Sequence, residues 1–395
     1  MEKIWICDST LRDGEQAPDA GMTFDQKITL GNALIDLGVD ILEAGFPRTS
    51  SMDADVIYRL AREAQNRDVI ISSVARCCQA DIDVSVKVLE PVINDKKGHL
   101  HLFTPTSFTH AANKLHKTPE EILNMTREGI QYAKNFAPIK WSAEDATRSD
   151  KDFLVKCVQT AIDAGATTIN LADTVGQMVD TQMQQLFEYV IQKTTHEGVI
   201  FSVHCHNDKG LATANSLFAI KGGAREVDCC MNGLGERAGN AALEEIVMAI
   251  KTTPEVYPFT TKIDTKKIME VSRLAENFSG FQVSRNKAII GKNAFLHASG
   301  IHQDGVIKGQ AANIKTMYNA IPPELLGRKN EIVITRHSGS CAIVYVLQQE
   351  GVEVDQEIAR ELLQHIKERA DHPKSFTREE LVALYQELAE NHKNS

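Results

Sequence analysis

Short apolar runs alternate with amphipathic segments along the first part of the chain. The apolar runs are rich in β-branched residues, and between them lie segments whose apolar residues recur every three or four positions, such as Leu30, Leu34 and Leu37. This pattern predicts buried strands separated by helices. The runs occupy residues 4–7, 40–46, 69–75, 99–103, 138–142, 167–171, 199–206 and 226–231.

The predicted helices carry start and stop signals. Thr23 and Gln26 have the spacing of a capping box at the start of the first helix. Three helices end in glycine directly before an apolar run, at Gly38, Gly165 and Gly223. Eight strands alternating with helices over about 250 residues favour an α/β fold of the (β/α)8 TIM-barrel type. An open parallel sheet is the alternative.

The pattern changes after about residue 261. Polar and small residues dominate the segment 297–305, and two amphipathic helices with capped starts follow, one from Asp355 and one from Thr377. We therefore predict a TIM-barrel catalytic domain at residues 1–265 and a smaller, mostly helical C-terminal appendage at residues 266–395.

Composition narrows the class of protein. Lys and Arg number 43 against 53 Asp and Glu, a net charge of -10, which argues against a nucleic-acid surface. The chain lacks a secretory signal pattern, and no run approaches 18 apolar residues. The 8 cysteines, including the pairs Cys77-Cys78 and Cys229-Cys230, lack the regular spacing of a disulfide scaffold. We expect a cytoplasmic protein that binds neither nucleic acid nor membranes.

Polar residues follow the ends of several predicted strands. In a parallel barrel these ends converge on one mouth. The strand at 199–206 ends in His204-Cys205-His206, where the two histidines point to the same side and Cys205 to the other. The residues gathered at strand ends are Arg12, Asp13, His101, Thr104, Glu144, Asp145, Asp173, Thr174, His204, His206, Asn232 and Asn240.

Two imidazoles, a carboxylate and an amide oxygen form a mixed nitrogen and oxygen set. Such a set suits octahedral Mg²⁺, Mn²⁺ or Zn²⁺ with open positions for a chelating ligand. Each residue alone has a simpler explanation: Asp13 as a solvated loop carboxylate with Asp8 as a competing ligand, Asn240 as a turn residue, and Glu144 as a surface carboxylate. The metal hypothesis therefore depends on their meeting at one mouth.

The loop at residues 233–239 contains Gly233, Gly235 and Gly239. Its spacing departs from the dinucleotide-binding fingerprint, and no acidic ribose partner follows on a further strand. We interpret these glycines as allowing a tight turn over the barrel mouth.

Five motifs in order carry a resemblance to a known family that spans nearly the whole chain. The chain resembles the 2-isopropylmalate synthases, which belong to the metal-dependent acyl-CoA condensing and cleaving TIM-barrel enzymes. The motifs are Asp8-Ser9-Thr10-Leu11-Arg12-Asp13-Gly14-Glu15-Gln16, Ser142-Ala143-Glu144-Asp145-Ala146, His204-Cys205-His206-Asn207-Asp208, Asn232-Gly233-Leu234-Gly235-Glu236-Arg237-Ala238-Gly239-Asn240 and Ser299-Gly300-Ile301-His302-Gln303-Asp304-Gly305.

The resemblance implies a Claisen-type condensation of acetyl-CoA with 2-oxoisovalerate, giving 2-isopropylmalate and CoA in leucine biosynthesis. It implies a divalent metal, Mg²⁺ or Mn²⁺ with Zn²⁺ as an alternative, and leaves a need for K⁺ open. It also implies a homodimer in which the C-terminal appendage, from the same chain or the partner, completes the active site. The implied metal ligands are Asp13, His204, His206 and Asn240.

The resemblance assigns further roles at the site. Arg12 would face the keto oxygen of the 2-oxo acid, with Glu144 supporting the site beside it. Thr174 would hold the substrate carboxylate, and His101 would also contact the substrate. His302, with Tyr318 nearby, would remove a proton from the acetyl methyl group.

Homocitrate synthase, acting on 2-oxoglutarate, and citramalate synthase, acting on pyruvate, are the nearest rivals. Homocitrate synthases usually have Glu at Asp13 and Lys-x-Gly at Ala298-Ser299-Gly300, so both positions favour isopropylmalate. The run Phe103-Thr104-Pro105 departs from the usual family form. It therefore leaves undecided which side chain of the 2-oxo acid the pocket accepts. An acyl-CoA lyase of the same family and an inactive scaffolding relative are the more distant candidates. The chain stops before the leucine-binding regulatory domain of longer members, so we expect no feedback inhibition through it.

Overall fold

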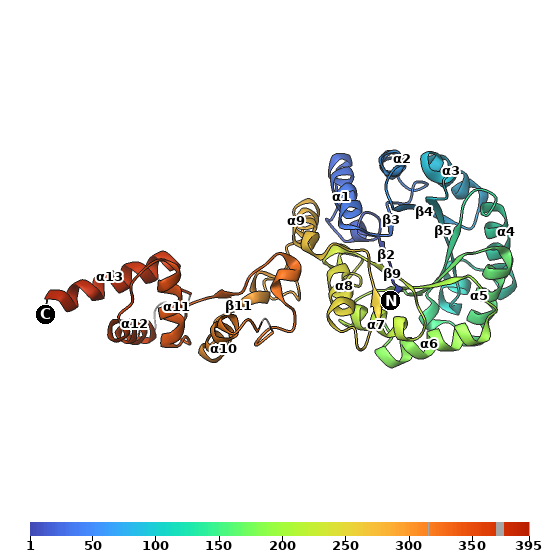
Figure 1. Cartoon of the computed structure of the whole chain (residues 1–395). Helices are drawn as coiled ribbons and strands as arrows, with labels where there is room; N and C mark the ends of the chain where they lie inside the picture. Colours follow the sequence, from blue (N-terminus) through green and yellow to red (C-terminus); the bar gives the residue numbers. More distant parts are fainter. Residues whose placement is uncertain (315, 369–374, 395) are drawn as a thin grey trace. The chain divides into compact units, whose positions relative to one another are not determined.

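The computed structural model of the chain describes residues 1–314, 316–368 and 375–394 (Figure 1). It divides into two compact units, Met1–Val283 and Ser284–Ser395. The division expected from the sequence, after residue 265, falls before helix α9 (Ile268–Ser279), which packs against α1 (Phe24–Leu37) in the first unit. The assignment of residues 266–395 to completion of the active site stays a prediction.

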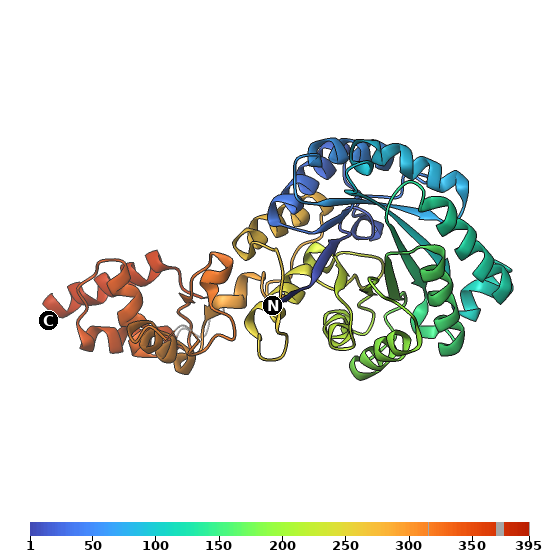
Figure 2. The same ribbon diagram turned by 45° about the vertical axis from the view of Figure 1, so that its right-hand side comes forward.

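The first unit is built on a closed parallel barrel (Figure 2). The strands follow one another around the barrel in chain order, and the first, β2, pairs with the last, β9. Each apolar run of the sequence contains most of one barrel strand, so the predicted TIM barrel is confirmed. The strands are β2 (Trp5–Asp8), β3 (Ile41–Glu43), β4 (Ile70–Arg76), β5 (Gly98–Pro105), β6 (Ile139–Glu144), β7 (Thr168–Asp173), β8 (Ile200–Cys205) and β9 (Glu226–Cys229).

Helices surround this barrel (Figures 1 and 2). The predicted capping box starts α1: the backbone N–H of Gln26 donates to Thr23 Oγ1 at 3.3 Å, and that of Thr23 donates to Gln26 Oε1 at 2.8 Å. Within the described residues, no helix combines the length and apolar composition needed to cross a membrane. The other helices of the ring are α2 (Ser51–Ala64), α3 (Gln79–Ile93), α4 (Pro119–Ala133), α5 (Lys151–Ala164), α6 (Asp180–Lys193), α7 (Ala212–Lys221) and α8 (Leu243–Thr252).

Glycine ends three of these helices as predicted, and the third, Gly223, follows α7 and its cap Gly222 with φ 114°. Gly38 follows α1 with φ 101°, and Gly165 follows α5 with φ 120°. Both lie in the left-handed region that side chains other than glycine rarely adopt. A Cβ at Gly38 would also lie 2.7 Å from the carbonyl oxygen of Lys262. These stops turn each helix directly into the next strand.

Two short parallel pairs were not predicted from the sequence. Strand β1 (Glu2–Lys3) pairs with β10 (Phe259–Thr260), and β11 (Leu296–His297) pairs with β12 (Glu331–Ile332). Two residues are too few to show a period, so no pattern could have indicated them.

The second unit has its own apolar core, formed mainly by helices. Its helices are α10 (Gly300–Ala311), α11 (Ser340–Gln349), α12 (Gln356–Glu368) and α13 (Arg378–Asn394). Both predicted capped helices are present: Asp355 accepts from the backbone N–H of Ile358 at 3.1 Å, and Thr377 accepts from that of Glu380 at 3.2 Å. The core includes Val306, Ile343, Leu347, Leu362, Ile366, Phe376 and Leu381.

Candidate active site

A cavity of about 480 Å³ lies at the carboxyl ends of the barrel strands. Most of the candidate residues of the first unit line it, although they come from distant parts of the sequence. The barrel topology therefore brings them to one mouth, as expected for the carboxyl ends of parallel strands. The candidates that line the cavity are Arg12, Asp13, His101, Glu144, Thr174, His204 and His206.

The four expected metal ligands gather at one side of this mouth. The Nε2 atoms of His204 and His206 are 3.1 Å apart at the end of β8. Asp13 Oδ2 lies 3.1 Å from His204 Nε2 and 3.8 Å from His206 Nε2. A backbone bridge pairs His206 with Asn240, which is also buried. The end of β8, which carries the histidines, and the segment that carries Asn240 are thus adjacent, although they are far apart in the sequence.

These residues fit a divalent cation. One donor atom from each of Asp13, His204 and His206 lies within 4.8 Å of the others, and all three residues are buried. Within the described chain, Asn240 Oδ1 is also buried without a hydrogen-bond partner. Buried acceptors without partners are costly, and a bound cation would satisfy them. Nitrogen and oxygen donors without thiolate suit Mg²⁺, Mn²⁺ or Zn²⁺.

The two histidines have opposite shifts in pKa. Burial disfavours the charged ring, yet Asp13 and Asp228 outweigh burial and raise the pKa of His204 to about 9. Burial and the neighbouring His204 lower the pKa of His206 to about 3. Burial would raise the pKa of Asp13, but Arg12 and His204 hold it well below its ordinary value. In the absence of a cation, His204 carries one extra proton near neutral pH and His206 is neutral, and metal binding would displace that extra proton.

Arg12 is held by a buried carboxylate. Its Nε donates to Glu43 Oε1 at 2.7 Å, and its Nη1 lies 3.3 Å from Asp13 Oδ2. His101 Nδ1 contacts the other oxygen of Glu43, and His101 Nε2 lies 2.6 Å from Ser142 Oγ. This chain of contacts fixes a charged guanidinium beside the expected metal ligands.

Glu144 and Thr174 line the same cavity but have neighbours of their own. Glu144 Oε1 lies 2.7 Å from His110 Nδ1 and accepts from Lys114 Nζ at 2.9 Å. Thr174 Oγ1 accepts from the backbone N–H of Asp145 at 2.9 Å. Glu144 therefore already has a cationic partner, Lys114, at the cavity, and its expected role beside Arg12 stays a prediction.

The glycine-rich loop packs closely over the mouth. A Cβ at Gly235 would lie 2.7 Å from Asn240 Cγ, and a Cβ at Gly239 would lie 2.1 Å from the carbonyl oxygen of Gly233. Only a residue without a side chain allows this approach. The loop also places Arg237 at the cavity, where its Nε donates to Asp208 at 2.7 Å.

His302 and Tyr318 belong to the second unit. Their rings stack with centroids 4.5 Å apart and planes 27° apart. His302 is exposed, and Tyr318 is 41% exposed. The structure thus brings the expected base and its tyrosine together on the surface of this unit, and their part in the reaction stays a prediction.

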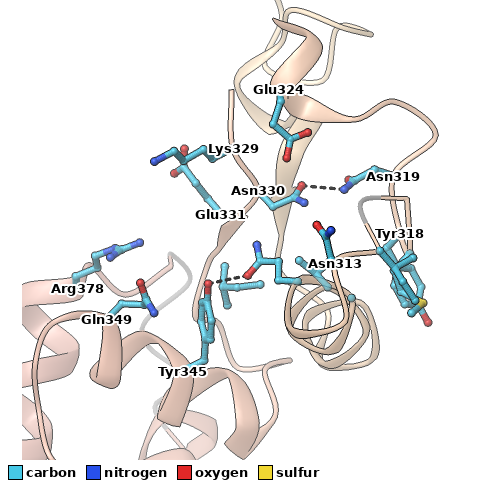
Figure 3. Close-up of a pocket in the computed structure, with 16 residues that line it drawn as sticks. Asn313, Tyr318, Asn319, Glu324, Lys329, Asn330, Glu331, Tyr345, Gln349 and Arg378 are labelled. Carbon is cyan, nitrogen blue, oxygen red and sulfur yellow. Dashed lines mark hydrogen bonds between the residues drawn. The ribbon is translucent and has the colours of Figure 1, made fainter. Parts of the chain in front are cut away.

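The second unit also contains a cavity of its own, of about 590 Å³, which Tyr318 lines (Figure 3). Two hydrogen bonds between lining side chains brace its walls. Asn319 Nδ2 donates to Asn330 Oδ1 at 3.0 Å, and the hydroxyl of Tyr345 donates to Gln310 Oε1 at 2.8 Å (Figure 3). Of the candidate residues, Tyr318 lines this cavity.

Four of the polar residues gathered at strand ends turn to other partners. Thr104 and Asp173 differ by an odd number of positions from the cavity residues of the same strand, so they face the surrounding helices and loops. Asp145 follows the end of β6 with a left-handed φ of 62°, where strand alternation no longer applies. Asn232 lies in a turn. Their partners are Trp141 Nε1 at 3.1 Å for Thr104, Arg148 Nε at 2.8 Å for Asp145, Thr147 Oγ1 at 2.8 Å for Asp173 and the carbonyl of Ser272 at 2.9 Å for Asn232.

Sequence reasoning missed Glu43 and Asp228. Both are buried, and both lie in apolar runs that were assigned to strands. A carboxylate inside a buried strand must be paired, so the residue type within an apolar run was the available signal. The partner of each carboxylate could not be known before the positions of the strands were known.

Comparison with known proteins gives the family. A model described as HMGL-like matches residues 3–275, and one described as homocitrate synthase post-HMGL domain-like matches residues 289–374. The 2-isopropylmalate synthase of Methylobacterium nodulans is 43% identical over 389 residues, which cover 98% of this chain and 73% of that protein. The enzyme of the same name from Caulobacter is 42% identical over 386 residues, 97% of this chain and 72% of that protein.

A solved structure agrees on the fold. The HMG-CoA lyase from Brucella melitensis has a TM-score of 0.59 at 18% identity and covers 71% of this chain and 100% of that chain. At this identity the similarity shows the fold alone. The resemblance carried by the five sequence motifs is confirmed by the curated relatives: the chain belongs to the 2-isopropylmalate synthase family.

Proposed function

We propose that this chain condenses acetyl-CoA with 2-oxoisovalerate and releases 2-isopropylmalate and CoA. Its membership of the family supports the reaction type. The observation that carries the choice of 2-oxo acid is an apolar wall inside the cavity, formed by Phe46, Val74 and Phe103. The rings of Phe46 and Phe103 meet edge to face with centroids 6.3 Å apart. An isopropyl group suits this wall because its transfer from water to apolar surroundings is favourable.

The two rival 2-oxo acids fit the wall less well. The second carboxylate of 2-oxoglutarate would need a cation, yet the cations that line the cavity already have carboxylate partners. Arg12 pairs with Glu43, Lys114 with Glu144 and Arg237 with Asp208. The methyl group of pyruvate would leave much of the wall without contact. Homocitrate and citramalate synthesis are therefore the second and third candidates.

Asp13, His204, His206 and Asn240 would hold the divalent cation that the family requires. When bound, such a cation polarises a carbonyl oxygen and orients a chelating 2-oxo acid. Mn²⁺ and Mg²⁺ are the preferred candidates because the donor set includes a carboxylate and an amide oxygen and lacks thiolate. Zn²⁺ is the third candidate. A requirement for K⁺ stays a prediction.

Arg12 acts where negative charge develops. Its guanidinium stabilises the alkoxide formed from the keto oxygen more than it stabilises the neutral carbonyl. Glu43 fixes the guanidinium by the 2.7 Å hydrogen bond, so little reorganisation is needed during the reaction. Thr174 binds the substrate carboxylate, and His101 contacts the substrate from β5.

His302 accepts the proton from the acetyl methyl group, and Tyr318 orients it. The support is the ring stacking on an exposed surface. These residues lie in a different compact unit from the barrel cavity. That residues 266–395, from the same chain or from a partner in a homodimer, complete the active site is part of this proposal. All cysteines are free, which suits the reducing cytoplasm in which we place the enzyme.

The test is product formation by the purified chain. Acetyl-CoA and 2-oxoisovalerate are incubated with Mn²⁺, and 2-isopropylmalate is identified by mass spectrometry. Arg12→Gln should lower kcat by about 10²- to 10³-fold, the cost of removing one donor to a developing oxyanion. Arg59→Gln is the control, because Arg59 is exposed on α2, where it pairs with Glu63. Absence of product from the folded, metal-loaded wild type would refute the proposal.

A further inference from the structure

A charged cluster lies in the barrel interior, where the proposed reaction does not use it. It consists of Lys140 from β6 together with Glu226 and Asp228 from β9, and all three side chains are buried. Lys140 Nζ lies 2.7 Å from Glu226 Oε1 and also contacts Asp228 Oδ1. Buried charges are costly to maintain, so a cluster of this kind calls for an explanation.

Asp228 is fixed from several sides. Its Oδ1 accepts from Lys140 Nζ and from Ser202 Oγ, the latter at 3.4 Å. Its Oδ2 accepts from Asn170 Nδ2 at 2.6 Å. The same Oδ2 lies 3.7 Å from His204 Nδ1. The carboxylate is therefore held rigidly with one oxygen toward the back of a metal-site histidine.

The two ring nitrogens of His204 have different surroundings. Its Nε2 points to Asp13 and His206. Its Nδ1 is buried and, in the part of the chain that the structure describes, has no hydrogen-bond partner within ordinary distance. A small rotation of the ring toward Asp228 would give this N–H an acceptor. Histidines that bind metals generally donate their second ring N–H to such a group.

We propose that Asp228 is a positioning residue for the metal site. It accepts the Nδ1–H of His204, which keeps the lone pair of Nε2 free for the cation and fixes the plane of the ring. Lys140 and Asn170 hold Asp228 in place for this task. The inference rests on the proposed metal site, but it concerns the affinity of that site and does not depend on which 2-oxo acid is the substrate.

The cluster offers a matched control. Glu226 and Asp228 both pair with Lys140, but it is Asp228 whose Oδ2 lies 3.7 Å from His204 Nδ1. Asp228→Asn and Glu226→Gln each remove one negative charge from the buried cluster while keeping the shape of the side chain. A general effect of disturbing the cluster would appear in both variants, and a positioning effect would appear in Asp228→Asn alone.

The experiment is titration of the metal-free full chain with Mn²⁺ by calorimetry, with folding checked by circular dichroism. Asp228→Asn should weaken Mn²⁺ binding by about 10- to 100-fold, and Glu226→Gln should leave it unchanged. In assays, excess Mn²⁺ should restore much of the kcat of Asp228→Asn. Equal weakening in both variants, or none in Asp228→Asn, would overturn the inference while leaving the proposed function intact. A wild type that binds no divalent metal would instead refute the proposed site.

A measurement on the wild type keeps the inference testable if Asp228→Asn does not fold. Long-range ¹H–¹⁵N correlation spectra of the Zn²⁺-loaded protein report the tautomer of each histidine ring. The signal of His204 is identified by its loss in His204→Gln. Protonation at Nδ1 is the expected result, and a ring protonated at Nε2 would contradict it.

Discussion

The ring of Tyr318 lies against Gly305, one turn along α10 from His302. A Cβ added at Gly305 would be 2.0 Å from Tyr318 Cε2, far inside van der Waals contact. Glycine inside a helix costs about 1 kcal/mol relative to alanine. At this position glycine leaves room for the ring that stacks on His302.

Gly305→Ala should therefore lower activity without unfolding the protein. The added methyl group displaces Tyr318 from His302, and a misplaced general base loses part of its contribution of about 10²- to 10⁴-fold. Kinetics and thermal unfolding measured together check this. Lys308→Ala, at an exposed position of the same helix, is the control. Full activity of Gly305→Ala would show that the stacking is not needed.

Asp13→Asn should abolish tight metal binding, whereas Asp8→Asn should retain it. Both aspartates are buried near the end of β2. Asp13 faces His204 at 3.1 Å, but Asp8 accepts from the backbone N–H and the hydroxyl of Thr10, each at 2.9 Å. Removal of metal with a chelator, followed by Mn²⁺ titration of each variant, distinguishes them. Loss of metal binding in Asp8→Asn alone would show that Asp8, and not Asp13, is the metal ligand.

The pH dependence of the free energy of unfolding should reflect the lowered pKa of Glu43. Burial alone would raise its pKa, but Arg12 and His101 lower it from 4.5 to about 2. A carboxylate with a lowered pKa contributes stability that is present above pH 4.5 and is lost as the pH falls toward 2. The expected contribution is about 3 kcal/mol.

The comparison is wild type against Glu43→Gln by denaturant unfolding between pH 7 and pH 3. The difference in unfolding free energy should be largest near neutral pH and should shrink below pH 4.5. A difference that stays constant or grows on acidification would contradict the assignment of the low pKa to Glu43.

Phe103→Ala should reduce the preference for a branched 2-oxo acid. Removing the ring takes away part of the apolar wall, so kcat/KM should fall about 10-fold for 2-oxoisovalerate and less for pyruvate, whose methyl group reaches less of it. Phe108→Ala is the control, because Phe108 is 76% exposed. Equal loss for both acids would show that the wall does not contact the substrate side chain.

The sequence was sufficient to predict the barrel because parallel strands covered on both faces appear as short apolar runs. It also indicated which residues meet at the mouth, because the carboxyl ends of such strands share one face. It failed at Thr104 and Asp173, where alternation along the strand turns the side chain outward, and at Asp145, where the chain leaves β6 with a left-handed φ of 62°. That rule was available from the sequence once His101, Glu144 and Thr174 had been chosen.

Other contacts were not predicted from the sequence for a different reason. Glu43 on β3 pairs with Arg12 in the loop after β2, and Asp228 on β9 approaches His204 on β8. Such pairs depend on the register between strands, which the local pattern does not contain. The contact of Tyr318 with Gly305 likewise depends on how the segment after α10 folds back on that helix.

The central claim is that this site condenses acetyl-CoA with 2-oxoisovalerate. The most direct test measures kcat/KM from CoA release with Mn²⁺, offering 2-oxoisovalerate, pyruvate and 2-oxoglutarate separately. The apolar wall predicts at least a roughly 10-fold preference for 2-oxoisovalerate, the discrimination that one or two methyl contacts supply. A higher kcat/KM with pyruvate or 2-oxoglutarate would contradict the claim.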